Sequence, residues 1–421
     1  MPSRHFPVRP NLEQLKHQAK DLLRAFRRGE PDAVADFLEH SPDVLDPAKA
    51  KLADAQFVLA RSYGLPHWPR LVAACQITDA IWRGDADAVR ALVARDPKLL
   101  EEDARGVKGN WGPPLSYAAN LGQDAVIEVL RSLGAKDFAY AFRRACLQGQ
   151  VATARRLHEL MGRPRPSQDA LDDAAYTLTV PGTELLLELG ARVRDEQGGR
   201  LAPVSVVLET DSRKPSAKHR ILELYAEHGL ELPDTPAMAL HRGRIDLLEV
   251  HLRRDPEMLR RTFAFEEIYP PEMGCHDEIL ATHGTPLAGT TLLHMAADYG
   301  EIEIAHWLLD RGMDADAPAA VDAEGFGGHT ALFSTVVSQT NFWMNHRGEP
   351  PAAPFTQLLL DHGANPKARA SLRKRLHPGY AIEGMQVYRN VTPIAWGEAF
   401  VLQKLVNREA MRLIAEKGGQ R

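Results

Sequence analysis

Apolar residues recur along this chain in a short unit that appears many times. In each copy an apolar turn of helix leads to a glycine and a polar residue, and apolar positions then return at three- and four-residue steps, as at Val89, Leu92 and Val93. Such steps indicate one buried stripe on a helix. The pattern therefore predicts pairs of antiparallel helices joined at a glycine. Copies follow Gly29, Gly84, Gly122, Gly149, Gly243 and Gly300.

A second set of glycines follows the apolar stripes and closes many of the units. These glycines are Gly134, Gly190, Gly229, Gly312 and Gly363. A glycine in this place is typical of a left-handed helix C-cap. One helix pair cannot bury its apolar face alone, so neighbouring pairs must stack into a continuous core. We therefore expect an all-α fold, a helical solenoid with short loops between the repeats.

Residues 1–75 follow a different pattern. Leu12, Leu15, Ala19 and Leu22 begin one helical stripe, and Leu52 begins part of another. Because the end of a solenoid needs a cap with one polar face, we interpret this segment as an N-terminal helical cap. A docking helix for a partner is the alternative.

Residues 289–305 resemble an ankyrin repeat, whose signature is Thr-Pro-Leu-His-x-Ala before a glycine turn. Thr291, His294 and Gly300 match it, and Leu292 stands in place of the proline. Weaker matches lie at 113–119, 328–333 and 392–395, and the resemblance spans about residues 76–421. It implies an ankyrin-type solenoid with short β-hairpin-like loops, which binds partners through its loop tips and concave surface. We divide the chain into the cap (1–75), degenerate repeats (76–261) and repeats with long loop insertions (262–421).

Three successive loops in the last third exceed the usual length of an ankyrin loop. They run over Thr262–Ala288, Asp322–His329 and Lys367–Val391. Adjacent repeats stack about 10 Å apart, so the sequence predicts that these tips lie side by side and enclose a cleft. A further insertion, 339–354, falls between two helices of one repeat and is expected at their opposite end.

The charges of these loops are segregated. Residues 262–283 contain five acidic residues and no Lys or Arg, whereas residues 364–382 contain five basic residues and no acid. One interpretation is mutual attraction that holds the tips together, at well under 1 kcal/mol for each exposed pair. The other is a dipolar cleft for a zwitterionic or peptide-like ligand. The candidate ligand-binding residues are Asp322, Glu324, Arg373, Lys374 and Arg389.

His276, Asp277, Glu278 and His329 are the candidate catalytic residues. Imidazoles and carboxylates from two loops can exchange protons or bind a metal, and a satisfied hydrogen-bond network is the alternative. The spacing matches no metal motif, so no metal is expected. His294 holds the histidine position of the ankyrin signature, where bracing of adjacent loops is expected. Cys275 is a weak nucleophile candidate because its acidic surroundings raise a thiol pKa.

The overall charge narrows the classes of function. Lys and Arg total 51 and Asp and Glu total 56, which gives a net charge of −5 and argues against general nucleic-acid binding. Three distant cysteines fit a reducing compartment, and no apolar run of about 18 residues indicates a membrane span. No phosphate-binding glycine loop or nucleophile elbow occurs, so no cofactor is expected.

Together these patterns predict a cytosolic ankyrin-repeat scaffold that recognises a protein partner through its concave face and loop tips. The alternative is an enzyme or small-ligand binder that acts on a small polar, zwitterionic or peptide-like substrate in the three-loop cleft. Neither nucleic acid nor a membrane is an expected partner.

Overall fold

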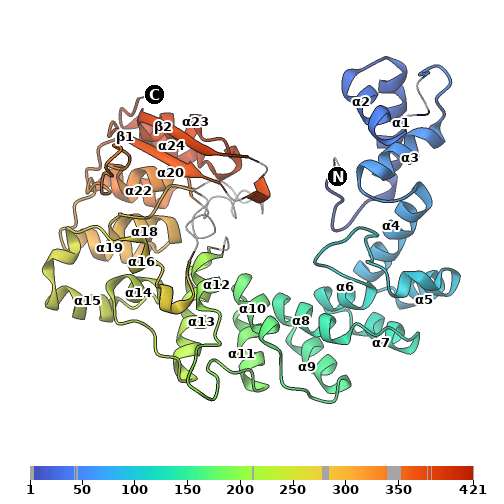
Figure 1. Ribbon diagram of the computed structural model, residues 1–421, viewed down its shortest axis with the longest axis horizontal. Helices are drawn as coiled ribbons and strands as arrows, with labels where there is room; N and C mark the ends of the chain where they lie inside the picture. The colour runs from blue at the N-terminus through green and yellow to red at the C-terminus, as the bar shows by residue number, and fades with distance from the viewer. Residues whose placement is uncertain are drawn as a thin grey trace. The chain divides into compact units, whose positions relative to one another are not determined.

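Pairs of helices account for most of the chain in the computed structural model (Figure 1). The structure describes residues 4–41, 43, 46–210, 213–276, 284–338, 352–376, 378–380 and 382–420. Internal contacts divide the chain into two compact units, residues 1–173 and 174–421. We call them unit 1 and unit 2. The helical content confirms the all-α class predicted from the sequence, and successive helices pack in pairs.

Unit 1 begins with four helices around an apolar cluster that runs from Phe6 to Cys75. Within it the rings of Phe26 and Phe37 stack with centroids 3.8 Å apart. The last of these helices crosses residue 75, and the sequence-based division at residues 75 and 261 stays a prediction. The elements are α1 (Leu12–Arg27), α2 (Pro31–His40), α3 (Leu52–Ser62), α4 (Trp68–Trp82), α5 (Ala86–Arg95), η1 (Pro97–Leu100), α6 (Pro114–Leu121), α7 (Asp124–Ser132), α8 (Phe138–Gln148) and α9 (Val151–Leu160), and α10 (Gln168–Tyr176) spans the boundary between the units.

The glycine turns of unit 1 receive a side chain from the following repeat. Gly84 has a φ of +69°, and a Cβ there would lie 2.7 Å from Oε1 of Gln123. Gly122 has a φ of +68°, and a Cβ there would lie 2.7 Å from Oε1 of Gln150. The two glutamine amides donate to backbone carbonyls of the preceding turn. Glycine is therefore required both by the left-handed backbone and by the packing of neighbouring repeats.

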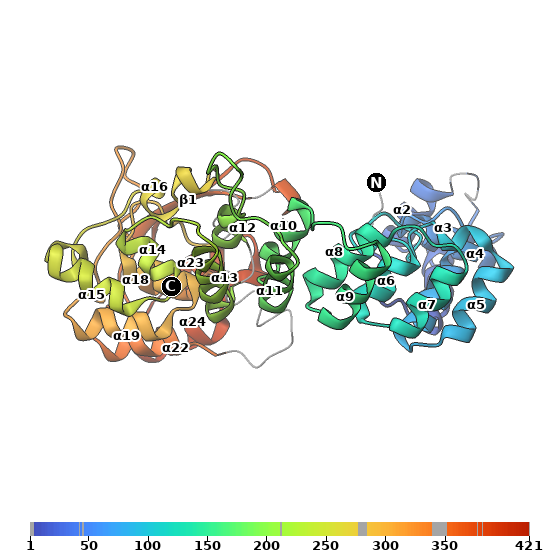
Figure 2. The same ribbon diagram turned by 90° about the horizontal axis from the view of Figure 1, so that it is seen from below.

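Unit 2 continues the helix pairs, and Figure 2 shows α19, α22 and α24 in a row. The helices are α11 (Val180–Glu188), α12 (Val204–Glu209), α13 (Pro215–Glu227), α14 (Pro236–His241), α15 (Ile245–Arg254), α16 (Phe265–Ile268), α18 (Leu292–Tyr299), α19 (Ile302–Asp310), α20 (Ala331–Val336), α22 (Pro354–Asp361), α23 (Pro393–Ala399) and α24 (Arg408–Glu416), with 3-10 turns η2 (Pro256–Leu259), η3 (Pro271–Met273), η4 (Pro378–Tyr380) and η5 (Gln403–Leu405). Every described helix is too short or too polar to cross a bilayer.

The third long loop contains an antiparallel β-hairpin of β1 (Ala370–Arg375) and β2 (Met385–Val391). Leu372 and Lys374 are buried on one face of β1, and Tyr388 of β2 lies 4.6 Å from the ring of Trp396 on α23. The alternation of buried and exposed residues is a strand pattern. Because β1 has basic residues on both of its faces, the sequence does not show the alternation of apolar and polar residues that predicts a strand. The sequence therefore predicted only a long basic loop.

The insertion 339–354 lies mostly outside the described residues. Its expected position therefore stays a prediction.

Candidate functional site

The three long loops of unit 2 lie side by side, joined by backbone hydrogen bonds. The amide of Ala320, just before the second loop, donates to the carbonyl of Gly289, just after the first, at 2.8 Å. The amide of Gly327 donates to the carbonyl of Ser371 in the hairpin, at 2.7 Å. The predicted adjacency of the loops is thus confirmed, and we call this group the three-loop site.

Two buried histidines brace the three-loop site from below. His294 Nε2 donates to the carbonyl of His329 at 2.9 Å, and its Nδ1 lies 2.9 Å from the hydroxyl of Thr291. His329 Nε2 in turn donates to the carbonyl of Pro286 at 3.0 Å. Burial lowers the pKa of His294 to about 3 and that of His329 to about 4. Both rings are therefore neutral near pH 7, and His294 has the bracing contact expected from its place in the signature.

Four of the predicted ligand-binding residues come together at the tips of the second and third loops. Arg373 forms ion pairs with Asp322, at 2.8 Å, and with Glu324. The guanidinium carbons of Arg373 and Arg389 lie 4.9 and 4.4 Å from the ring centroid of Phe326. Arg373 thus pairs with both acids, which is the mutual attraction between loops that the charge pattern allowed.

The fifth predicted ligand-binding residue, Lys374, lies apart from this group. Lys374 is buried, with an exposed fraction of 4%, on the opposite face of β1 from Arg373. His276 is exposed, and Asp277 and Glu278 lie outside the described residues. The catalytic cluster therefore stays a prediction.

Cys275 is buried beside Glu209. Burial, and then the carboxylate of Glu209, raise the pKa of the thiol far above its ordinary value. A protonated, enclosed thiol is a poor nucleophile. This agrees with the expectation from the sequence that Cys275 is a weak nucleophile candidate.

A cavity of about 330 Å³ lies between the three loops. His329 lines it, and among the described residues Nδ1 of this buried ring has no hydrogen-bond partner. The other lining residues are Pro286, Ala288, Gly289, Ala320, Val321, Asp322, Phe326, Gly327, Leu372 and Arg373. The lining is mainly apolar, with an ion pair at one end.

A cluster of buried charged residues near this site, Arg213, Lys218, Asp298 and Glu301, was not predicted from the sequence. Arg213 and Asp298 form an ion pair at 3.0 Å with exposed fractions of 1% and 0%. Burial raises the pKa of Asp298, although Arg213 opposes the shift. The guanidinium of Arg213 and the ammonium of Lys218 lie 4.3 and 4.1 Å from the ring centroid of Tyr299.

Glu301 lies between Lys218 and His219 in the same cluster. Lys218 Nζ and His219 Nε2 lie 2.9 and 2.8 Å from Oε1 of Glu301. Burial acts to raise the pKa of Glu301, but Lys218 and His219 outweigh it and hold the pKa below its usual value. Glu301 follows turn glycine Gly300 as Gln123 follows Gly122, so the glycine register is the signal that marks this position.

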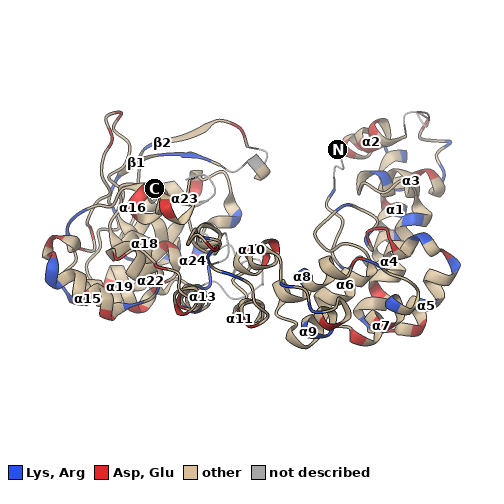
Figure 3. Ribbon diagram, turned by 60° about the horizontal axis from the view of Figure 1, so that its bottom comes forward, with Lys and Arg blue, Asp and Glu red and all other residues tan. Residues whose placement is uncertain are grey.

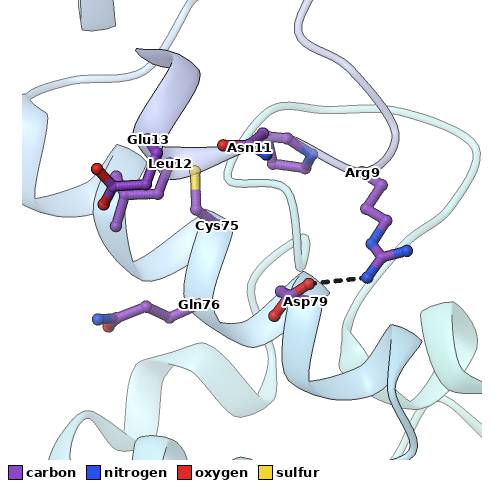
Figure 4. A pocket seen from close by; sticks show the side chains of 8 residues that line it. Arg9, Asn11, Leu12, Glu13, Cys75, Gln76 and Asp79 are labelled. Atoms are coloured by element: carbon purple, nitrogen blue, oxygen red, sulfur yellow. Dashed lines mark hydrogen bonds and ion pairs between the residues drawn. The ribbon is translucent and has the colours of Figure 1, made fainter. Parts of the chain in front are cut away.

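A cavity of about 570 Å³ opens in unit 1 beside the first turn of α1 (Figure 4). Arg9 pairs with Asp79 of α4 at 3.0 Å, and its guanidinium lies 5.3 Å from the ring of Trp82. These contacts tie the segment before α1 to α4. Across the described ranges of both units, no group of three or more His, Cys, Asp or Glu is arranged to hold a metal ion.

Comparison with known proteins agrees with the helix pairs. A family model described as an ankyrin repeat matches residues 289–317, which contain α18 and α19. No curated protein sequence matches the chain significantly. Among solved structures, the crystal structure of the human ASB11 ankyrin repeat domain is similar, with 16% identity, a TM-score of 0.26, and coverage of 73% of this chain and 99% of that chain.

Proposed function

Because this chain is an ankyrin-repeat protein, we propose that it is a cytosolic scaffold that recognises a protein partner through its concave face and loop tips. Ankyrin repeats generally mediate interactions between proteins. Fold alone does not assign a function, so the proposal depends on how the loops are arranged.

The observation that supports the proposal most directly is the locked arrangement of the three-loop site. Backbone hydrogen bonds and two buried histidines hold three separate loops as one surface. A surface ordered before binding loses little conformational entropy when a partner docks. Val321 stands directly before the turn at the tip of the second loop with an exposed fraction of 62%, which is unusual for a branched apolar side chain.

The test is affinity capture from native lysate with the full chain and two variants, each partner then being identified and its affinity measured. Val321→Glu places a charge on the loop tip, and Leu160→Glu makes the same kind of change at an exposed position of α9 in unit 1. We expect a saturable partner whose affinity falls at least about tenfold with Val321→Glu and is unchanged by Leu160→Glu. No saturable partner, or one sensitive to Leu160→Glu alone, would contradict the proposal.

The cavity of the three-loop site favours a second candidate function. His329 presents a buried Nδ1 without a partner, and such an atom gains a hydrogen bond when a donor group enters. We infer a site for a small polar or zwitterionic molecule, with no reaction assigned. Dipeptides and amino acids are expected to raise the melting temperature of the chain and to lose this effect with Leu372→Trp, which fills the cavity. Equal shifts in the two proteins, or none, would exclude this candidate.

A further inference from the structure

We propose that the free edge of β2 binds an extended, acidic segment of a partner protein, which pairs with β2 as a third strand. This inference rests on the proposed function, because it names the binding surface and the class of partner. It places the contact on the hairpin rather than on the concave face of the helices. Figure 3 shows β1 and β2 extending from the helices of unit 2, with basic residues along β1.

One face of the hairpin is buried and the other is left open. Arg375 pairs with Met385 and Arg373 with Val387 across the two strands, and residues opposite each other share a face. The exposed fractions of Met385 and Val387 are 46% and 52%. We call Arg373, Arg375, Met385, Val387 and Arg389 the outer face of the hairpin. It is a basic surface with two apolar side chains at its centre.

The outer edge of β2 is available for pairing. β2 pairs with β1 along one edge, and β1 is bridged at Ser371 to Gly327. In the part of the chain that the structure describes, no strand pairs with the second edge of β2. A free strand edge presents unpaired amides and carbonyls, which an extended peptide satisfies by adding a strand.

The charges of the outer face select an acidic segment. Residues 364–391 contain six basic residues, with Glu383 as the single acid. Arg373 pairs with Asp322 and Glu324, whereas among the described residues no carboxylate lies within ion-pair distance of Arg375 or Arg389. β2 carries one charged residue, Arg389, and no acid, so a second copy of β2 would supply no carboxylate to Arg389, and the charges favour a different, acidic chain.

Arg389 is also ordered before any partner arrives. Its guanidinium stacks 4.4 Å from the ring centroid of Phe326, and this ring has an exposed fraction of only 7%. A cation held in place by an aromatic ring pays little rotamer entropy when it meets a carboxylate. Alternate residues of an added strand would therefore be apolar beside Met385 and Val387 and acidic beside Arg389.

The experiment uses the full chain and a fluorescein-labelled peptide with valine, valine and aspartate at three alternate positions and threonine between them, so that the three share one face of a strand. Binding is followed by fluorescence anisotropy in low salt. Arg389→Glu is expected to weaken binding at least about tenfold and to favour the same peptide with lysine in place of aspartate. Arg253→Glu, at an exposed position of α15, is the matched control and is expected to bind the acidic peptide as the unchanged chain does.

Strand addition has its own control, because it requires peptide amides. Methylating alternate backbone nitrogens of the peptide on the pairing side is expected to abolish binding, whereas methylating the other side is not. Equal loss in Arg389→Glu and Arg253→Glu, or no effect of methylation, would overturn the inference. So would dimerisation of the chain through β2, or tighter binding to polyuridine RNA than to the peptide.

The lysate capture separates this inference from the proposed function. If Arg389→Glu leaves a captured partner bound while Val321→Glu releases it, the hairpin inference fails and the scaffold proposal stands. If neither change affects any partner and the acidic peptide still binds β2, the proposed function fails alone.

Discussion

At the scale of single residues, the buried charges of unit 2 are stable only in pairs. Arg213 and Asp298 are both enclosed, so removing one charge leaves the other without its counter-ion in a medium of low dielectric constant. Asp298→Asn is expected to lower the free energy of unfolding by about 3–5 kcal/mol in urea titrations. Glu409→Gln breaks the exposed pair with Arg412 and is expected to leave the free energy of unfolding almost unchanged, because solvent screens the pair. Similar losses in the two variants would contradict the buried pair.

Gly327 is the glycine of the three-loop site that a side chain disturbs most. It has a φ of +118°, and a Cβ there would lie 1.9 Å from the carbonyl oxygen of Ala320. Gly327→Ala must therefore push apart the two sides of the second loop, at Ala320 and Gly327. We expect a loss of stability at least twice that of Gly312→Ala, which has a φ of +88° but open space around it and costs about 1 kcal/mol. Thermal unfolding of the two variants checks this, and equal losses would refute the close approach.

The buried histidines give unit 2 a dependence on pH. The folded-state pKa values of His294 and His329 are about 3 and about 4, below the value of about 6.5 for an unfolded chain. Between these values the unfolded chain binds more protons, so stability is complete above pH 6.5 and falls as the pH is lowered. At pH 5 each of the two histidines is expected to lower the free energy of unfolding by about 2 kcal/mol relative to its value above pH 6.5.

Urea midpoints measured between pH 7.5 and pH 5 test this dependence. His329→Gln is expected to flatten the slope by about one proton. His306→Gln, at an exposed position of α19, is expected to keep the slope of the unchanged chain. If His329→Gln also keeps it, His329 is not the buried neutral ring described above.

At the scale of elements, Tyr388 packs the hairpin against the helices through aromatic contacts. Tyr388 lies edge-on to Trp396 at 4.6 Å and near Phe400 at 6.4 Å. Tyr388→Ala is expected to release the hairpin while the helices stay folded, so that trypsin cuts after Arg373 and Arg389 at least about tenfold faster. Met385→Ala, at an exposed position of the same strand, is the control. Unchanged cleavage in Tyr388→Ala would show that other contacts hold the hairpin.

The sequence allowed the helix pairs to be predicted because their signals are local. Apolar steps and turn glycines are set within a few residues, and repeat stacking then places the three loops together. The ion-pair partner of a buried charged residue, in contrast, can lie far away in the sequence. Arg213 and Asp298 are 85 positions apart, and nothing in either segment shows that they meet. The strands of the hairpin were missed for a related reason, because burial of Lys374 contradicts the usual exposure of lysine.

At the scale of the whole molecule, the two units differ in what they offer a partner. Unit 1 consists of helix pairs with short connections and the apolar cluster at its start. Unit 2 adds the three-loop site and the hairpin, which provide exposed apolar and basic side chains on an ordered support. We therefore place partner recognition on unit 2.

Hydrogen exchange of the full chain, measured by mass spectrometry with and without a captured partner, tests this placement most directly. The partner is expected to slow amide exchange within 286–291, 319–329 and 370–391 and to leave α1 to α9 unchanged. Slower exchange confined to unit 1, or no change anywhere in the three loops, would contradict the account.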